Sequence, residues 1–171
     1  MAELRKMTMG EIAEIADIPK ETARSRLKGS LGFVSSYGWA RFDAAMTARV
    51  ATHAQALRLF GPPEIAFKIA DFIGESLENF SQIPPHVLKR KGTLADNFLL
   101  FRQTQPPYWS EHWCKSQDEA LHMLGVFARK SYLGLEGSGF LVVNVGTLTD
   151  WALHRIFDLQ GIAGNEATVP Q

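Results

Sequence analysis

Apolar residues at helical spacing first appear near the start of the chain, directly after a residue pair that favours a helix start. Thr8 precedes Glu11 by three positions, the spacing at which each side chain bonds the other residue's backbone amide in a capping box. The apolar positions that follow recur on one face of a helix, and they are Ile12, Ala13, Ile15 and Ala16. The pattern therefore predicts a short helix that begins just after Thr8.

A second short helix is predicted after a break at Asp17-Ile18. Pro19 suits the first turn of a helix, where its missing N–H removes no hydrogen bond. From Lys20 to about Lys28 the apolar stripe is only Ala23 and Leu27, and the other positions are mostly hydrogen-bond donors. Two such helices are typical of a helix-turn-helix, whose second helix enters the major groove of DNA. The alternative is a pair of surface helices in an ordinary bundle, with a solvated charged face.

A glycine-rich and aromatic stretch follows the second helix. Gly29, Gly32 and Gly38 favour turns, and the aromatic pieces between them favour short strands. We expect a β-hairpin, or wing, with Ser35-Ser36 near its tip. The strand-like residues are Phe33-Val34 on one side and Tyr37, Trp39 and Phe42 on the other.

Two longer helices are predicted next. Asp43 suits the N-cap of a helix that continues to about Phe60, and Gly61 ends it. Its apolar residues are spaced 4, 4, 3 and 3 apart, a helical periodicity, and they are Met46, Val50, Ala54, Leu57 and Phe60. Pro62-Pro63 then opens a helix from about Glu64 to Phe80, with one apolar side.

The second half of the chain alternates strand-like and helical patterns in the order β-β-α-β-α. Apolar or alternating runs predict strands at 97–103, 108–115 and 140–145. Ser116 with Glu119 predicts a capped helix to about Lys130, and Thr147 with Asp150 a last helix to about Asp158. In the second strand, Trp109, Glu111 and Trp113 should share one side, opposite Tyr108, Ser110, His112 and Cys114.

These elements give the expected fold class, α+β, with a mostly helical winged helix-turn-helix ahead of a small α+β domain. The expected domains are residues 1–80 for DNA binding and 94–160 for dimerisation or effector binding. A linker, 81–93, separates them, because Pro84-Pro85 disfavours helix. It carries the basic cluster Lys89-Arg90-Lys91, which is either a solvated loop or a phosphate-contacting hinge. Residues 161–171 are expected to be a flexible tail.

Charge is distributed unevenly although the 171 residues sum to a net charge of zero. Residues 1–60 carry 9 basic and 6 acidic side chains, whereas residues 61–171 carry 9 and 12. Within 19–41 there are 5 basic residues and 1 acidic one, so positive charge gathers at the second helix, as expected of a nucleic-acid-binding surface.

The single cysteine, the lack of an apolar signal segment in residues 1–30 and the lack of any run of 18 apolar residues favour a cytoplasmic protein that does not cross a membrane.

The order of these elements resembles the MerR-like winged-helix DNA-binding domain over roughly residues 7–75. The family's Thr-x-Arg element is matched by Thr22-Ala23-Arg24, and its wing-closing segment loosely by 38–43 (GWARFD). The Leu-Arg-x-x-Gly element at the end of the next helix is matched by 57–61 (LRLFG), and the Glu-Ile that follows by Glu64-Ile65. The resemblance implies a winged helix that binds double-stranded DNA.

The chain also departs from this family. Ser25-Arg26 stand where two adjacent aromatic residues are usual, and no long dimerisation helix follows Phe80. The family's dimer geometry therefore does not carry over. The Asp-x-His-x-x-Gly element of cobalamin-binding effector domains is not found either.

We therefore expect a sequence-specific DNA-binding transcriptional regulator. Arg24, Ser25 and Arg26 are candidates to contact bases or phosphates, with Arg24 preferred for bases and Arg26 for a phosphate. The wing should lie along the backbone or minor groove. The predicted DNA-binding residues are Lys20, Thr22, Arg24, Ser25, Arg26, Lys28, Tyr37, Trp39 and Arg41. The alternatives are an architectural recombination or excision accessory factor and a protein-interaction module that no longer binds DNA.

The second half offers little candidate chemistry. Its neighbouring polar residues lack the paired spacing of a metal site, and Cys114, in its alternating strand, is expected to be a buried thiol. We expect no enzyme activity, no metal and no cofactor. Its aromatic residues instead favour a homodimer interface within residues 94–160, and a small-molecule or protein effector stays open.

Overall fold

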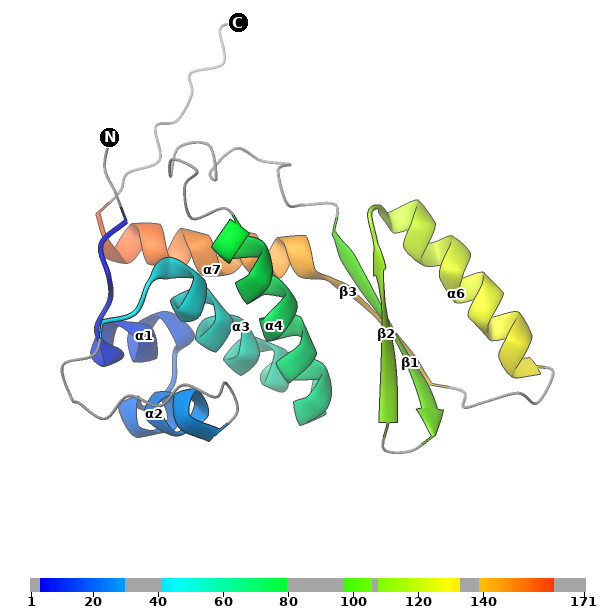
Figure 1. Cartoon of the computed structure of the whole chain (residues 1–171), viewed down its shortest axis with the longest axis horizontal. Coiled ribbons are helices and arrows are strands. Elements are labelled where there is room, and N and C mark those ends of the chain that lie inside the picture. Colours follow the sequence, from blue (N-terminus) through cyan, green and yellow to red (C-terminus); the bar gives the residue numbers. More distant parts are fainter. Residues whose placement is uncertain (1–3, 30–40, 80–96, 106–107, 133–138, 162–171) are drawn as a thin grey trace, which may run out of the picture.

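The computed structural model describes residues 4–29, 41–79, 97–105, 108–132 and 139–161. Side chains are described for these residues except 27–29, 78–79, 104–105 and 130–132. The linker 81–93, the tail 162–171 and most of the expected wing lie outside this part of the chain. The elements are α1 (Met9–Ala16), α2 (Lys20–Gly29), α3 (Ala44–Phe60), α4 (Pro63–Asn79), β1 (Phe98–Gln105), β2 (Tyr108–Cys114), α6 (Gln117–Tyr132), β3 (Phe140–Asn144) and α7 (Val145–Leu159) (Figure 1).

The sheet separates two groups of helices. In Figure 1, α1, α3, α4 and α7 lie on one side of the strands and α6 lies on the other. The described strands form one antiparallel sheet in the order β2-β1-β3. This arrangement confirms the α+β class and the order β-β-α-β-α expected for the second half.

The two faces of the sheet belong to two apolar clusters. Leu99 and Phe101 of β1 point into the cluster that includes the cores of α1, α3, α4 and α7. Phe98 and Leu100, on the opposite face, pack with Ala120 of α6. Strand pairing places Trp113 opposite Leu99 and Cys114 opposite Phe98, which confirms the predicted alternation of β2. Cys114 is buried, and burial raises the pKa of its thiol.

Helix α3 is buried more completely than its sequence pattern predicts. The sequence indicates one apolar stripe, whereas the structure buries Thr47, Thr52 and His53 as well as the alanines between them. The reason is that α1, α4 and α7 all pack against α3. Small side chains let these helices approach closely. At Gly74 of α4 an added Cβ would lie 2.9 Å from Cδ of Arg49, and Arg49 also forms an ion pair with Asp71.

The last helix joins the two halves of the chain. Helix α7 starts directly after β3, and its N-cap is Asn144, whose Oδ1 accepts from Thr147 N at 2.9 Å. The predicted cap at Thr147 with Asp150 is therefore wrong. Buried residues of α7, among them Leu153, Ile156 and Phe157, lie in the same core as Ile12 of α1.

Hydrogen bonds tie the C-terminal part of α7 and its C-cap to the start of the chain. Gln160 accepts from the backbone N of Arg5 at 3.2 Å and donates to its carbonyl at 2.9 Å. The Arg155 guanidinium donates to the Glu14 carbonyl at 3.1 Å. Described residues of both expected domains therefore contribute to one apolar cluster.

Candidate nucleic-acid interface

Helix α1 begins with the capping box that the sequence predicts. Glu11 N donates to Oγ1 of Thr8 at 3.3 Å, and Thr8 N donates to Oε2 of Glu11 at 2.7 Å. Arg5 forms an ion pair with the same carboxylate. The hydrogen bond from Arg5, joined by those from Thr8, lowers the pKa of Glu11 to about 2. This network fixes where α1 starts.

The turn between α1 and α2 has the hydrogen bonds of a Schellman motif. Ile18 N donates to the Ala13 carbonyl at 3.0 Å, and Asp17 N donates to the Glu14 carbonyl at 3.1 Å. Asp17 has a left-handed backbone with φ of 52°, a conformation that aspartate tolerates better than most residues. Arg58 of α3 binds both the carboxylate and the carbonyl of Asp17. The turn is therefore held from within and from α3.

Helix α2 is held by little apolar surface. Of its side chains from Lys20 to Arg26, only Ala23 is buried. Lys20, Glu21 and Ser25 are exposed, and the remaining three are partly buried. Figure 1 shows α2 at the outer edge of the molecule, beside α1 and away from the sheet. The structure thus presents a polar helix after a fixed turn.

Arg24 lies on the outer part of α2 and is paired within the helix. Its Nη1 donates to both carboxylate oxygens of Glu21, at 2.7 and 2.8 Å. The pair is open to solvent, with 43% of the Arg24 side chain and 75% of the Glu21 side chain exposed. Glu21 was not among the residues predicted from the sequence, although its position three residues before Arg24 favours such a pair on a helix.

Arg26 lies in different surroundings. Its Nη1 is buried and has no hydrogen-bond partner among the described residues. Burial lowers the pKa of Arg26, and the nearby positive charge of Arg58 lowers it further. On α3, burial and the charge of Arg26 lower the pKa of His53 to about 4. Arg26 therefore lies toward α3, between α2 and the rest of the core, whereas Arg24 lies on the solvent side.

The expected wing is described only at its end. Arg41 is exposed, and Phe42 forms an isolated antiparallel bridge with Met7, with Met7 N donating to the Phe42 carbonyl at 2.7 Å. Tyr37 and Trp39 lie outside the described residues, as does the side chain of Lys28. The structure therefore places Lys20, Thr22, Arg24, Ser25 and Arg26 on α2. The bridge ties Phe42, the neighbour of Arg41, to the segment that precedes α1.

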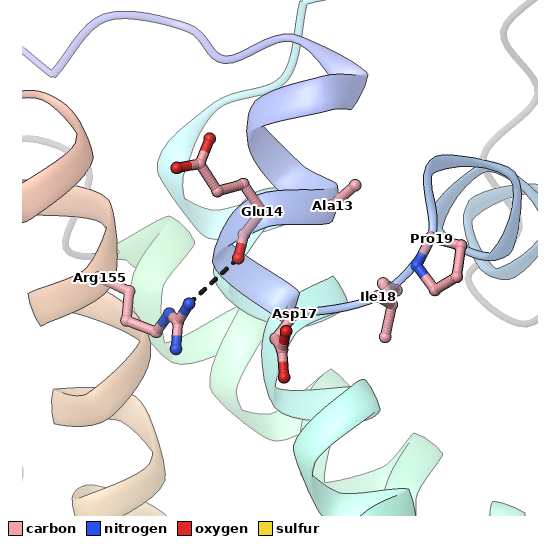
Figure 2. A pocket seen from close by; sticks show the side chains of 6 residues that line it. All are labelled: Ala13, Glu14, Asp17, Ile18, Pro19 and Arg155. Carbon is pink, nitrogen blue, oxygen red and sulfur yellow. Dashed lines mark hydrogen bonds between the residues drawn. The ribbon is translucent and has the colours of Figure 1, made fainter.

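A shallow pocket of about 460 Å³ lies where the turn meets α7. Figure 2 shows its lining residues, which come from α1, from the turn and from α7. Arg155 reaches from α7 to the Glu14 carbonyl across this pocket (Figure 2). The remaining lining residues are Ala13, Asp17, Ile18 and Pro19. The pocket shows that α7 contacts the part of α1 that leads into α2.

The described residues contain no group of three or more His, Cys, Asp or Glu side chains arranged to hold a metal ion. No helix in the described part of the chain is long and apolar enough to cross a membrane.

No family model and no curated protein sequence matches the chain. Function therefore has to be inferred from the site itself.

Proposed function

We propose that the chain is a sequence-specific binding protein for double-stranded DNA and that it regulates transcription. The observation that carries the proposal is the outer position of α2, where Ala23 is the one buried side chain among those described. A helix with so little apolar contact and a fixed orientation suits insertion into the major groove, which admits one α-helix.

The charges near α2 support this assignment. From Lys20 to Lys28 the helix carries four basic residues and one acidic residue. Lys20 and Arg41 are exposed, and we expect them to neutralise phosphates. Such contacts release counterions, so affinity should fall as the salt concentration rises. Arg24 and Ser25 are the side chains on α2 that we assign to the base edges.

The position of Arg26 changes its expected role. A guanidinium that lies toward α3, beside Arg58, has to turn outward before it can contact a phosphate. We therefore assign Arg26 a supporting role behind α2, in place of the phosphate contact expected from the sequence. The resemblance to MerR-like winged helices over residues 7–75 agrees with a DNA-binding role for this part of the chain.

A homodimer through residues 94–160 stays a prediction. It is supported by two exposed aromatic side chains on β2, an outer strand of the described sheet: Tyr108 is 68% exposed and Trp113 is 46% exposed. Aromatic residues are enriched at the centres of interfaces. A dimer that binds two half-sites at once would have a higher affinity for DNA than a single α2 region bound to one half-site.

Selection of bound sequences from a random duplex pool tests the proposed function. We expect the full chain to enrich a defined sequence. We expect Arg24→Ala to lose about fivefold to a hundredfold in affinity for that sequence and less for a scrambled duplex. His122→Gln is the control and should leave both affinities unchanged, because His122 is an exposed residue of α6 and α6 lies across the sheet from the other helices (Figure 1). A wild-type chain that retards no duplex at low salt would refute the proposal.

A further inference from the structure

The ion pair on α2 leaves one edge of the Arg24 guanidinium open. Only Nη1 is used by Glu21, which receives both hydrogen bonds, at 2.7 and 2.8 Å. Nε and Nη2 have no hydrogen bond with any described residue. These two nitrogens form one edge of the planar group and donate in parallel directions. The ion pair therefore fixes the guanidinium through Nη1 and leaves Nε and Nη2, a fork of two parallel donors, for an acceptor on another molecule.

We propose that Glu21 is a positioning residue that presents Nε and Nη2 of Arg24 to one guanine in the bound DNA. This inference rests on the proposed function and adds the base that Arg24 reads and the residue that directs it. Guanine offers O6 and N7 as two acceptors on its major-groove edge, the match for a two-donor fork. Adenine offers one acceptor and one donor there, so it cannot accept both hydrogen bonds.

Because the Glu21–Arg24 ion pair is exposed, we expect it to orient the Arg24 side chain more than it stabilises the fold. Exposed ion pairs between neighbouring turns contribute little to the stability of a fold. The same pair removes rotational freedom from a long side chain that otherwise samples many orientations, and binding is stronger when that freedom has been lost beforehand. The carboxylate also disfavours a nearby phosphate, which directs Arg24 away from the DNA backbone and toward a base edge.

The test is a double-mutant cycle on DNA preference. The selected duplex and a duplex with the contacted guanine pair replaced by an adenine pair are titrated with the wild-type chain, Glu21→Ala, Arg24→Ala and the double variant. The quantity compared is the ratio of the two dissociation constants. We expect Arg24→Ala to lower this guanine preference by about tenfold or more, and Glu21→Ala to lower it by about two- to fivefold. In the double variant, loss of Glu21 should have no further effect, because it acts through Arg24.

Two further variants separate positioning from charge and from folding. Arg24→Lys should keep affinity for the adenine duplex within about threefold but lose most of the extra affinity for the guanine duplex, because an ammonium group is a point charge without a fork. Glu14→Ala removes the same charge from an exposed residue of α1, outside α2, and should leave the preference unchanged.

Three outcomes would overturn the inference. The first is equal loss of affinity for both duplexes in Glu21→Ala. The second is an effect of Glu21→Ala that persists in the Arg24→Ala background, since Glu21 would then contact DNA by itself. The third is selection of a site without a guanine that depends on Arg24. In each case the chain still binds DNA, so the proposed function stands; if the wild-type chain binds no duplex, the proposed function itself fails.

Discussion

Helices α2 and α6 both lie at the outside of the molecule, but they differ in how much apolar surface they pack against its core. Helix α6 covers one face of the sheet with an apolar side, in which Ala120 is buried and Met123, Leu124 and Phe127 pack against Leu100 and its neighbours. Helix α2 contributes one buried alanine among its described side chains. Helix α6 is therefore an ordinary amphipathic helix that completes a core. Helix α2 is fixed by its turn and presents its polar side chains outward.

The difference also appears in how arginines are used. Arg102, on the face covered by α6, lies over the ring of Phe127, with Cζ 5.2 Å from the ring centroid. His112 on the same face makes an edge-to-face contact with Phe127. Both polar side chains under α6 thus contact an aromatic ring of the fold. On α2, Arg24 keeps two donors directed away from its one described partner, which is the arrangement expected of a group that binds something else.

The largest expected effect is on stability at α6. Phe127→Ala should lower the free energy of unfolding by about 2–3 kcal/mol, because it removes a large half-buried side chain together with its ring contacts. Arg24→Ala on α2 should change it by no more than about 0.5 kcal/mol, as for most surface substitutions. Chemical denaturation monitored by circular dichroism measures both. If Arg24→Ala is as destabilising as Phe127→Ala, α2 is part of the structural framework and the contrast with α6 is wrong.

A smaller effect is expected from the histidine behind α2. The folded-state pKa of His53 is about 4, below its ordinary value of 6.5, because of burial and the charge of Arg26. Between these two values the unfolded chain binds a proton that the folded chain does not, so stability falls as pH is lowered from about 6.5 to 4. We expect the free energy of unfolding of His53→Gln to fall by on the order of 1–2 kcal/mol less than that of the wild-type chain between pH 6.5 and 4.

The control for the histidine is His122→Gln on α6, since His122 is exposed. Urea unfolding of both variants and of the wild-type chain at pH 4, 5, 6 and 7 provides the comparison. Parallel stability curves for His53→Gln and the wild-type chain would show that the cluster of His53, Arg26 and Arg58 does not lower the stability of the folded state at acid pH.

Local patterns in the sequence predicted local structure well. The capping box at Thr8 and the alternating faces of β2 each depend on residues within a few positions of one another, and both are confirmed. The end of α3 at Gly61 is confirmed for the same reason, because glycine accommodates its φ of 83°. In each case the information lies in one short segment.

Features that depend on distant packing were missed. Arg58 binds Asp17 from 41 positions away, and no spacing rule links the two residues. The burial of α3 on several sides required knowing that α7 returns to the N-terminal helices. The inward position of Arg26 was also missed. Arg24 and Arg26 were expected to make different contacts with DNA, but nothing in the local pattern of α2 indicates that α3 lies on the side of Arg26.

The most direct test of the proposed DNA-binding surface maps the contact in solution. Amide chemical shifts of the isotope-labelled full chain are followed during titration with the selected duplex and, at the same salt concentration, with a scrambled duplex. Our account predicts that the largest shifts specific to the selected duplex fall in residues 17–29, which form the turn and α2, and that residues 117–132 of α6 hardly shift. Specific shifts centred on α6 or β2, with residues 17–29 unchanged, would contradict it.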